Sequence, residues 1–68
     1  MALSARNQLQ GTVEEVERGT IMARVVVRVG DNLIESAITR QSADELQLAK
    51  GDVVTAVVKA TEVMISKP

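Results

Sequence analysis

The run Val53-Val54-Thr55-Ala56-Val57-Val58 constrains the fold of this chain more than any other stretch. Successive residues of an extended strand point to opposite faces, and here both faces are apolar apart from Thr55. Strands of this kind are covered on both sides in folded proteins. A chain of 68 residues buries only about 60% of the surface that it exposes when unfolded. The run therefore predicts cover from another subunit.

The missing residue types narrow the means of stabilising so small a domain. Disulfides, structural metals and oligomerisation are the usual supplements, and this chain has no Cys and no His. Disulfides and metal sites built from thiolate or imidazole are thus excluded, which leaves oligomerisation. The chain also lacks Phe, Tyr and Trp, and its apolar fraction of 46% comes from Val, Ala, Leu, Ile and Met, which suits tightly packed sheets.

Period-two alternation predicts five strands, at residues 3–16, 21–29, 33–39, 53–58 and 63–65. In the first, Gly11 and a slip of the period between Val13 and Val16 predict a bulge in a long, curved strand. The second is the clearest: its odd-numbered residues are apolar, while Arg24, Val26 and Arg28 lie on the other face, which we expect to be only partly solvated.

Turn and capping signals complete the expected fold. Gly19 is expected to supply a positive φ to the turn at residues 18–20, and residues 30–32 form a second turn. The sequence Ser42-Ala43-Asp44-Glu45 matches a capping box, so a helix is predicted from Ser42 to about Leu48, with Leu46 and Leu48 as anchors and Gly51 in the stop signal. The element order is that of an all-β protein, a small five-stranded OB-like Greek-key barrel with one short helix between strands 3 and 4. Residues 1–68 form a single domain.

Several function classes are disfavoured by residue type. Without His, Cys or Tyr there are almost no candidates for a nucleophile with its base, so we expect no enzyme. The cluster Glu14, Glu15 and Glu17 is typical of a charged strand edge that resists association. Nucleic acid is not an expected partner, because the chain has no aromatic residue to stack bases and a net charge of −1. No apolar run approaches the ~20 residues of a membrane span, so a soluble cytoplasmic protein without a membrane partner is expected.

A small oxyanion remains possible, because a few N–H and O–H donors with one or two cations can hold it. Ser4 and Arg6 lie two residues apart near the start of the chain, and Lys59 and Thr61 lie two apart near its end. In an extended strand such pairs share a face. Each pair alone is also typical of a solvated strand end, so the spacing is weakly specific.

The chain resembles the molbindins, small cytoplasmic molybdate-binding proteins that consist of a single Mop-type domain, also called a TOBE domain. The resemblance covers nearly the whole chain in the right order, and it rests on residues 4–11 (SARNQLQG), 42–46 (SADEL), 50–52 (KGD) and 57–65 (VVKATEVMI).

The resemblance implies the assembly and the site. Molbindins form hexamers, trimers of dimers in which the first strand is exchanged between partners to complete an OB-like barrel. Molybdate or tungstate binds between subunits, so the site would combine the opening motif of one subunit with the closing motif of a neighbour. Hydroxyls would donate from Ser4 and Thr61, Arg6 and Lys59 would offset the charge, and backbone N–H groups would donate from Ala5 and Ala60. No other cofactor is implied, and molybdenum would be bound only as molybdate.

The chain departs from the family pattern at Gln47, where Gly is expected, and in its short turn at residues 30–32. Both positions lie outside the expected main site. A second, axial kind of site known in the family cannot be assigned to residues here. The leading hypothesis is storage or buffering of molybdate or tungstate, and the alternative is a regulatory or scaffolding oligomerisation domain whose assembly is biased by anion binding.

Overall fold

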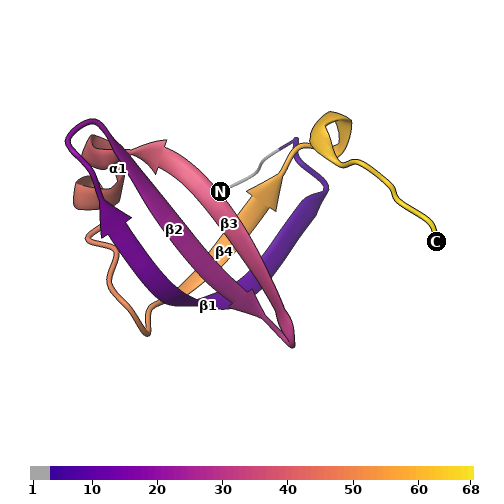
Figure 1. Ribbon diagram of the computed structural model, residues 1–68, viewed down its shortest axis with the longest axis horizontal. Coiled ribbons are helices and arrows are strands. Elements are labelled where there is room, and N and C mark those ends of the chain that lie inside the picture. Colours follow the sequence, from indigo (N-terminus) through magenta and orange to yellow (C-terminus); the bar gives the residue numbers. More distant parts are fainter. Residues whose placement is uncertain (1–3) are drawn as a thin grey trace.

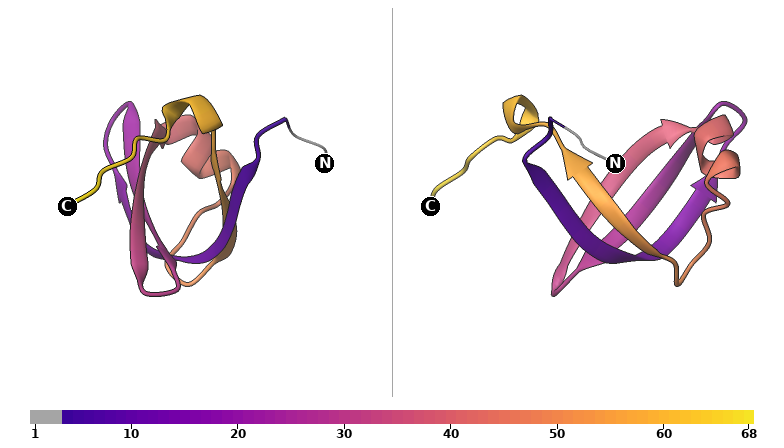
Figure 2. Two further views of the ribbon diagram at one scale, coloured as in Figure 1. Left: turned by 90° about the vertical axis from the view of Figure 1, so that its right-hand side faces the viewer. Right: turned by 180° about the vertical axis from the view of Figure 1, so that it is seen from behind.

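In the computed structural model, which describes residues 4–68, four antiparallel strands form one sheet in the order β3-β2-β1-β4 (Figure 1). The sheet is bent into a trough, with β2 and β3 on one side and β4 on the other (Figure 2). The all-β class and the short helix before the fourth strand are confirmed. The elements are β1 (Asn7–Arg18), β2 (Met22–Val29), β3 (Asn32–Thr39), α1 (Arg40–Glu45), β4 (Val53–Val58) and the 3-10 helix η1 (Ala60–Glu62).

The long first strand forms the bend of the trough. Its first half pairs with β4, from Asn7 opposite Val58 to Thr12 opposite Val53, and its second half pairs with β2. The register shifts between Val13 and Glu15, which confirms the expected bulge. Bulges bend a strand and increase its twist. One strand can therefore serve both sides of the sheet, although it begins later and ends later than the sequence predicts, and Leu3 lies outside the described residues.

Gly19 and Gly30 lie in the two hairpin turns, and of these two only Gly30 has a positive φ. Gly30 has a φ of 61° in the β2–β3 turn, as expected. Gly19 is not among the glycines with a positive φ, so that expectation is wrong. A Cβ at Gly19 would lie 3.0 Å from the carbonyl oxygen of Met22, whose oxygen also accepts the Gly19 N–H at 2.8 Å. Gly19 is thus favoured by tight backbone approach and not by left-handed geometry.

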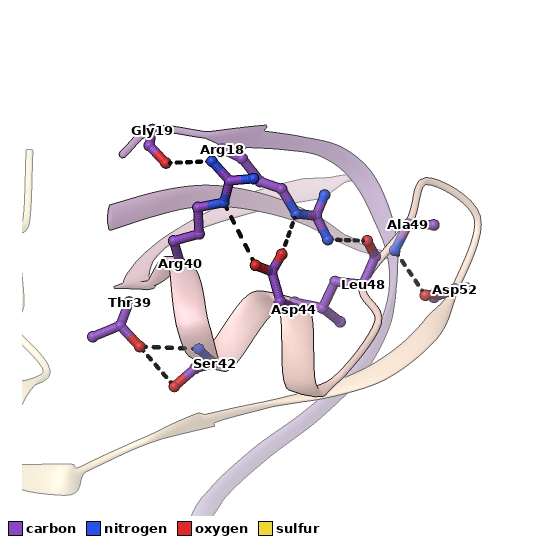
Figure 3. Close-up of polar contacts among 9 residues, drawn as sticks. All are labelled: Arg18, Gly19, Thr39, Arg40, Ser42, Asp44, Leu48, Ala49 and Asp52. Atoms are coloured by element: carbon purple, nitrogen blue, oxygen red, sulfur yellow. Dashed lines mark hydrogen bonds and ion pairs between the residues drawn. The ribbon is translucent and has the colours of Figure 1, made fainter. Parts of the chain in front are cut away.

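Helix α1 begins at Arg40 and not at Ser42, so the capping-box prediction is wrong. Thr39, the last residue of β3, is the N-cap, and its hydroxyl oxygen accepts the Ser42 N–H at 3.1 Å (Figure 3). The Thr39 backbone is extended, as an N-cap requires, so the strand passes directly into the helix. Leu48 packs against the core as expected, whereas Leu46 is 66% exposed and is no anchor.

Helix α1 ends in a Schellman motif built on Gln47 and not on Gly51. The N–H of Leu48 donates to the Ala43 carbonyl at 3.1 Å, and the N–H of Gln47 donates to the Asp44 carbonyl at 3.0 Å. This pattern places a left-handed residue just after the C-cap, usually Gly, and Gln47 takes that conformation with a φ of 52°. The unusual residue noted in the sequence is therefore at the position that most favours glycine.

Replacing Gln47 with glycine should raise the free energy of unfolding by about 0.5–1 kcal/mol, because a side chain in the left-handed region is strained. Urea unfolding at fixed protein concentration measures the change. Gln41→Gly is the matched control: Gln41 lies inside α1, where glycine should destabilise by about 0.5–1 kcal/mol. A loss of stability in both variants would contradict the strain at Gln47.

The core lies inside the trough, where Val13, Val25 and Val27 form a buried cluster. Val26, on the opposite face between two arginines, is also buried within one chain, at 5% exposure, so this face is less solvated than its charges suggest. The buried apolar residues within residues 4–68 are Val13, Ala23, Val25, Val26, Val27 and Ala43.

The last apolar segments of the chain are poorly covered. Along β4 half-buried and exposed residues alternate, and Val53 and Val57 are 68% and 46% exposed. The fifth strand expected at residues 63–65 is not formed within residues 4–68. After η1 this segment leads away from the sheet (Figure 1), so it meets no strand edge of its own chain, and an isolated segment cannot form a ladder.

Candidate oxyanion site

The two segments that carry the expected ligands continue from neighbouring strand ends. The β1–β4 ladder ends at the pair Asn7–Val58. Residues 4–6 precede this pair on one strand, and residues 59–61 follow it on the other. The fold therefore brings both segments to one corner of the same chain, here called the ligand corner. Their assignment to different subunits stays a prediction.

The ligand corner is open to solvent. Ser4, Arg6, Lys59, Ala60 and Thr61 are exposed, and Ala5 is half-buried. Among the described residues, no hydrogen bond or ion pair joins residues 4–6 to residues 59–61. The expected ligands are thus near one another without being linked. Their hydrogen-bonding groups remain able to meet a ligand.

Local hydrogen bonds shape both segments. The side-chain amide of Gln8 donates to the Ala5 carbonyl at 3.1 Å, a contact that the sequence analysis missed and that only a three-residue spacing could have suggested. In η1 the N–H of Glu62 donates to the Lys59 carbonyl at 2.9 Å, and that of Val63 to the Ala60 carbonyl at 3.4 Å. The first N–H groups of a helix have no partner within it, so those of Ala60 and Thr61 are not used by this turn.

Arg18 and Arg40, unlike the cations of the ligand corner, both form ion pairs with Asp44. The Asp44 carboxylate accepts a hydrogen bond from Arg18 Nε at 2.9 Å, and its other oxygen lies 3.5 Å from Arg40 Nε (Figure 3). The hydrogen bond from Arg18 is the main cause that lowers the pKa of Asp44, and the nearby Arg40 adds to it. The Arg18 guanidinium also donates to the Leu48 carbonyl at 2.8 Å. These two arginines tie the helix to the β1–β2 turn.

The remaining arginines of the sheet are paired across strands. Arg24 bridges to Glu35 on β3 and to Glu15 on β1, with N–O distances of 2.5 and 3.4 Å. Arg28 pairs with Glu14, and this hydrogen bond lowers the pKa of Glu14. The acidic cluster of β1 is thus part of a surface ion-pair network, and its interpretation as a charged strand edge that resists association stays a prediction. No group of acidic residues within residues 4–68 has the arrangement of a metal site.

Arg6 and Lys59 are different, since neither forms an ion pair within residues 4–68. Lys50 and Lys67 are also unpaired there, but neither belongs to the ligand corner. Two positive charges without a carboxylate therefore lie on adjoining segments. Such an arrangement attracts an anion, and side-chain hydroxyls and free N–H groups beside it can orient one.

Comparison with known proteins gives closely similar chains. The TOBE domain family model matches residues 3–65. Molybdenum-pterin-binding protein 1 of Clostridium pasteurianum is 47% identical over 66 residues, which are 96% of this chain and 97% of that protein. A molybdate binding protein from Sporomusa ovata superposes with a TM-score of 0.94 at 45% identity, over 98% of this chain and 100% of the other.

A third similar protein is longer. The cytoplasmic molybdate-binding protein ModG, solved with molybdate bound, superposes with a TM-score of 0.84 at 43% identity. The match covers 88% of this chain and 43% of that one. Within residues 4–68, no helix is long and apolar enough to cross a membrane. The likenesses extend over almost the whole chain, in sequence and in backbone.

Proposed function

The chain belongs to the TOBE domain family as a Mop-type domain, and from that premise we propose that it binds molybdate at the ligand corner. The observation that carries the proposal is the pair of cations Arg6 and Lys59, which no carboxylate of residues 4–68 neutralises. Two of the similar structures are those of molybdate-binding proteins. The family binds its ligand without catalysis, so the proposal contains no chemical step.

Each ligand residue has a role that its group can perform. Arg6 and Lys59 offset the two negative charges of the anion. The hydroxyls of Ser4 and Thr61 donate hydrogen bonds, and backbone N–H groups donate at Ala5 and Ala60. Every hydrogen bond to the dianion is charge-assisted and about twice as strong as a neutral one, and the two cations add direct attraction between opposite charges. Hydroxyls and N–H groups set the shape that a tetrahedral oxyanion must fit.

The proposed assembly is a homo-oligomer, a hexamer built as a trimer of dimers, with the anion between subunits. Val53 and Val57 support it, because exposed apolar side chains on one strand are typical of an interface. A ligand shared between subunits favours the assembled state by mass action. Exchange of the first strand stays a prediction, since β1 pairs with β2 and β4 of its own chain in this structure.

The proposed role is storage or buffering of molybdate or tungstate in the cytoplasm, by residues 1–68 as a single domain. The exposed apolar residues of β4 also support the alternative, a scaffolding or regulatory domain in which the anion only biases assembly. The two roles differ in capacity and affinity. A store must bind several anions per assembly, whereas a scaffold can assemble fully without any.

Titration calorimetry with molybdate, tungstate, sulfate and phosphate should show saturable binding of molybdate and tungstate at micromolar affinity or tighter, with sulfate excluded. Sulfate is the smaller anion and fits a ring of donors poorly. Phosphate, partly protonated near neutral pH, leaves its proton without an acceptor in a site made of donors. No heat with any oxyanion would contradict the proposal, and binding far below one anion per chain would favour the scaffold.

A further inference from the structure

The opening half of the ligand corner is held to the sheet by one side-chain hydrogen bond. The Gln8 amide nitrogen Nε2 donates to the Ala5 carbonyl oxygen at 3.1 Å. Within residues 4–68, no other hydrogen bond or ion pair reaches residues 4–6. We propose that Gln8 is a positioning residue for the oxyanion site, acting through Ala5 and Arg6 without contacting the anion. This inference rests on the proposed function and adds to it a residue outside the expected ligands.

The hydrogen bond spans a bend in the chain. The backbone bends at Ser4 and again at Arg6, before β1 begins at Asn7. The regular alternation of a strand therefore does not fix the direction of the Arg6 side chain. Gln8 lies in β1 on one side of the second bend, and Ala5 lies on the other side. Their contact thus closes the bend and restrains backbone that the β1–β4 ladder leaves free.

The contact acts on the peptide unit that joins two of the expected ligands. The Ala5–Arg6 unit is trans, and the atoms of a peptide unit lie in one plane. Holding its carbonyl oxygen toward the Gln8 amide therefore restricts rotation of the whole plane, which is described by ψ of Ala5 and φ of Arg6. These two angles decide how the Ala5 N–H and the Arg6 side chain are directed relative to β1. One hydrogen bond thus orients two ligand residues.

The closing half of the corner is held differently, by its own backbone. In η1 the N–H groups of Glu62 and Val63 donate to the carbonyls of Lys59 and Ala60. Residues 4–6 have no such backbone bond within the described part of the chain. Groups that are ordered before binding raise affinity, because less conformational freedom is lost when the ligand arrives. Gln8 therefore supplies for the opening half the order that η1 supplies for the closing half.

Replacing Gln8 with methionine tests this role, because it removes the donor at nearly constant side-chain length. Gln10→Met is the matched control: Gln10 is also exposed, lies two residues along the same face of β1, and forms no side-chain hydrogen bond within residues 4–68. Calorimetric titration with molybdate should give an affinity about two- to tenfold lower for Q8M than for the parent chain, the usual effect of one hydrogen bond. The Q10M affinity and the urea unfolding midpoints of both variants should match those of the parent chain.

NMR relaxation of the protein without any oxyanion separates positioning from direct contact with the anion. In Q8M the ¹H–¹⁵N NOE should fall at Ala5 and Arg6, which reports greater motion on the picosecond to nanosecond timescale. It should stay unchanged at residues 59–61, and throughout the corner in Q10M. A loss of affinity without this gain in motion would mean that Gln8 contacts the anion itself, and the positioning role would be wrong.

The same titrations distinguish failure of this inference from failure of the proposed function. If the parent chain binds molybdate and Q8M binds it equally tightly, Gln8 has no positioning role, while the proposed function stands. An equal loss of affinity in Q10M would also overturn the role, because Gln10 has no contact with residues 4–6 to lose. If the parent chain binds no oxyanion, both the proposed function and the role of Gln8 are wrong.

Discussion

Replacing Arg6 and Lys59 individually with alanine should weaken molybdate binding by roughly ten- to a hundredfold each, with the fold unchanged. Hydrogen bonds to charged groups contribute about 1.5–3 kcal/mol, and each 1.4 kcal/mol is about a factor of ten in affinity. Both side chains are exposed and belong to no ion pair within residues 4–68. Their removal therefore disturbs neither the core nor the ion-pair network. Calorimetric titration of each variant gives the affinity, and thermal unfolding gives the stability.

Lys50→Ala is the matched control for these variants. Lys50 is also exposed and unpaired within residues 4–68, but it precedes β4 at the end opposite the ligand corner. The control removes one positive charge without removing a proposed ligand. If it weakened molybdate binding as much as Arg6→Ala, the affinity would come from overall charge, and the assignment of the two ligands would be wrong.

Replacing Gly11 with alanine should lower the free energy of unfolding by about 3 kcal/mol, because the added Cβ would overlap atoms of β2. A Cβ at Gly11 would lie 2.4 Å from the carbonyl oxygen of Arg28 and 2.8 Å from Cγ1 of Val27. The carbonyl belongs to β2 and cannot turn aside without breaking the sheet at the bend of β1. A chain of 68 residues ordinarily has a free energy of unfolding of roughly 3–10 kcal/mol. The variant should therefore unfold at a urea concentration well below the unfolding midpoint of the parent chain.

Gly30→Ala separates steric conflict from backbone strain. Gly30 has a φ of 61°, and an added Cβ there meets nothing within 4 Å. Its replacement should cost only about 1 kcal/mol, the usual penalty for a side chain in left-handed geometry. Urea unfolding of both variants at one protein concentration gives the comparison. Equal losses would show that contact with β2 is not what requires glycine at position 11.

Much of the fold could be predicted because period-two alternation survives in the strands that bury one face. In residues 21–29 the alternation is nearly complete, and β2 forms there. The bulge in β1 was also visible, because a slip of one residue moves every later side chain to the opposite face. Val13 is the first buried residue before that slip, at 1% exposure.

The misjudged elements were those in which two local patterns compete or a partner strand is missing. Ser42 and Thr39 can each cap a helix, and only the extended end of β3 decides for Thr39. Residues 63–65 have strand propensity, but a strand exists only where another edge accepts its hydrogen bonds. Propensity could not reveal that the segment leads away from the sheet in this structure (Figure 1).

The candidate site was predictable in its residue types and not in its arrangement. The spacing of hydroxyls and cations indicated which residues share a strand face. The β1–β4 register, which brings Asn7 opposite Val58, was needed to place the two segments at one corner. The sequence also could not show that four arginines are neutralised by carboxylates, which leaves Arg6 and Lys59 as the unpaired cations of the ligand corner within residues 4–68. The four are Arg18, Arg24, Arg28 and Arg40.

Within residues 4–68 the sheet has two unpaired edges, and the proposed sites between subunits link the amount of anion that a cell holds to assembly. If sites form only between subunits, the number of complete sites grows faster than the number of chains at low abundance, because dilute copies stay dissociated. Doubling synthesis would then more than double the capacity. A change in expression level alone would then convert the protein from dissociated copies without anion to assembled copies that hold it, without a separate effector.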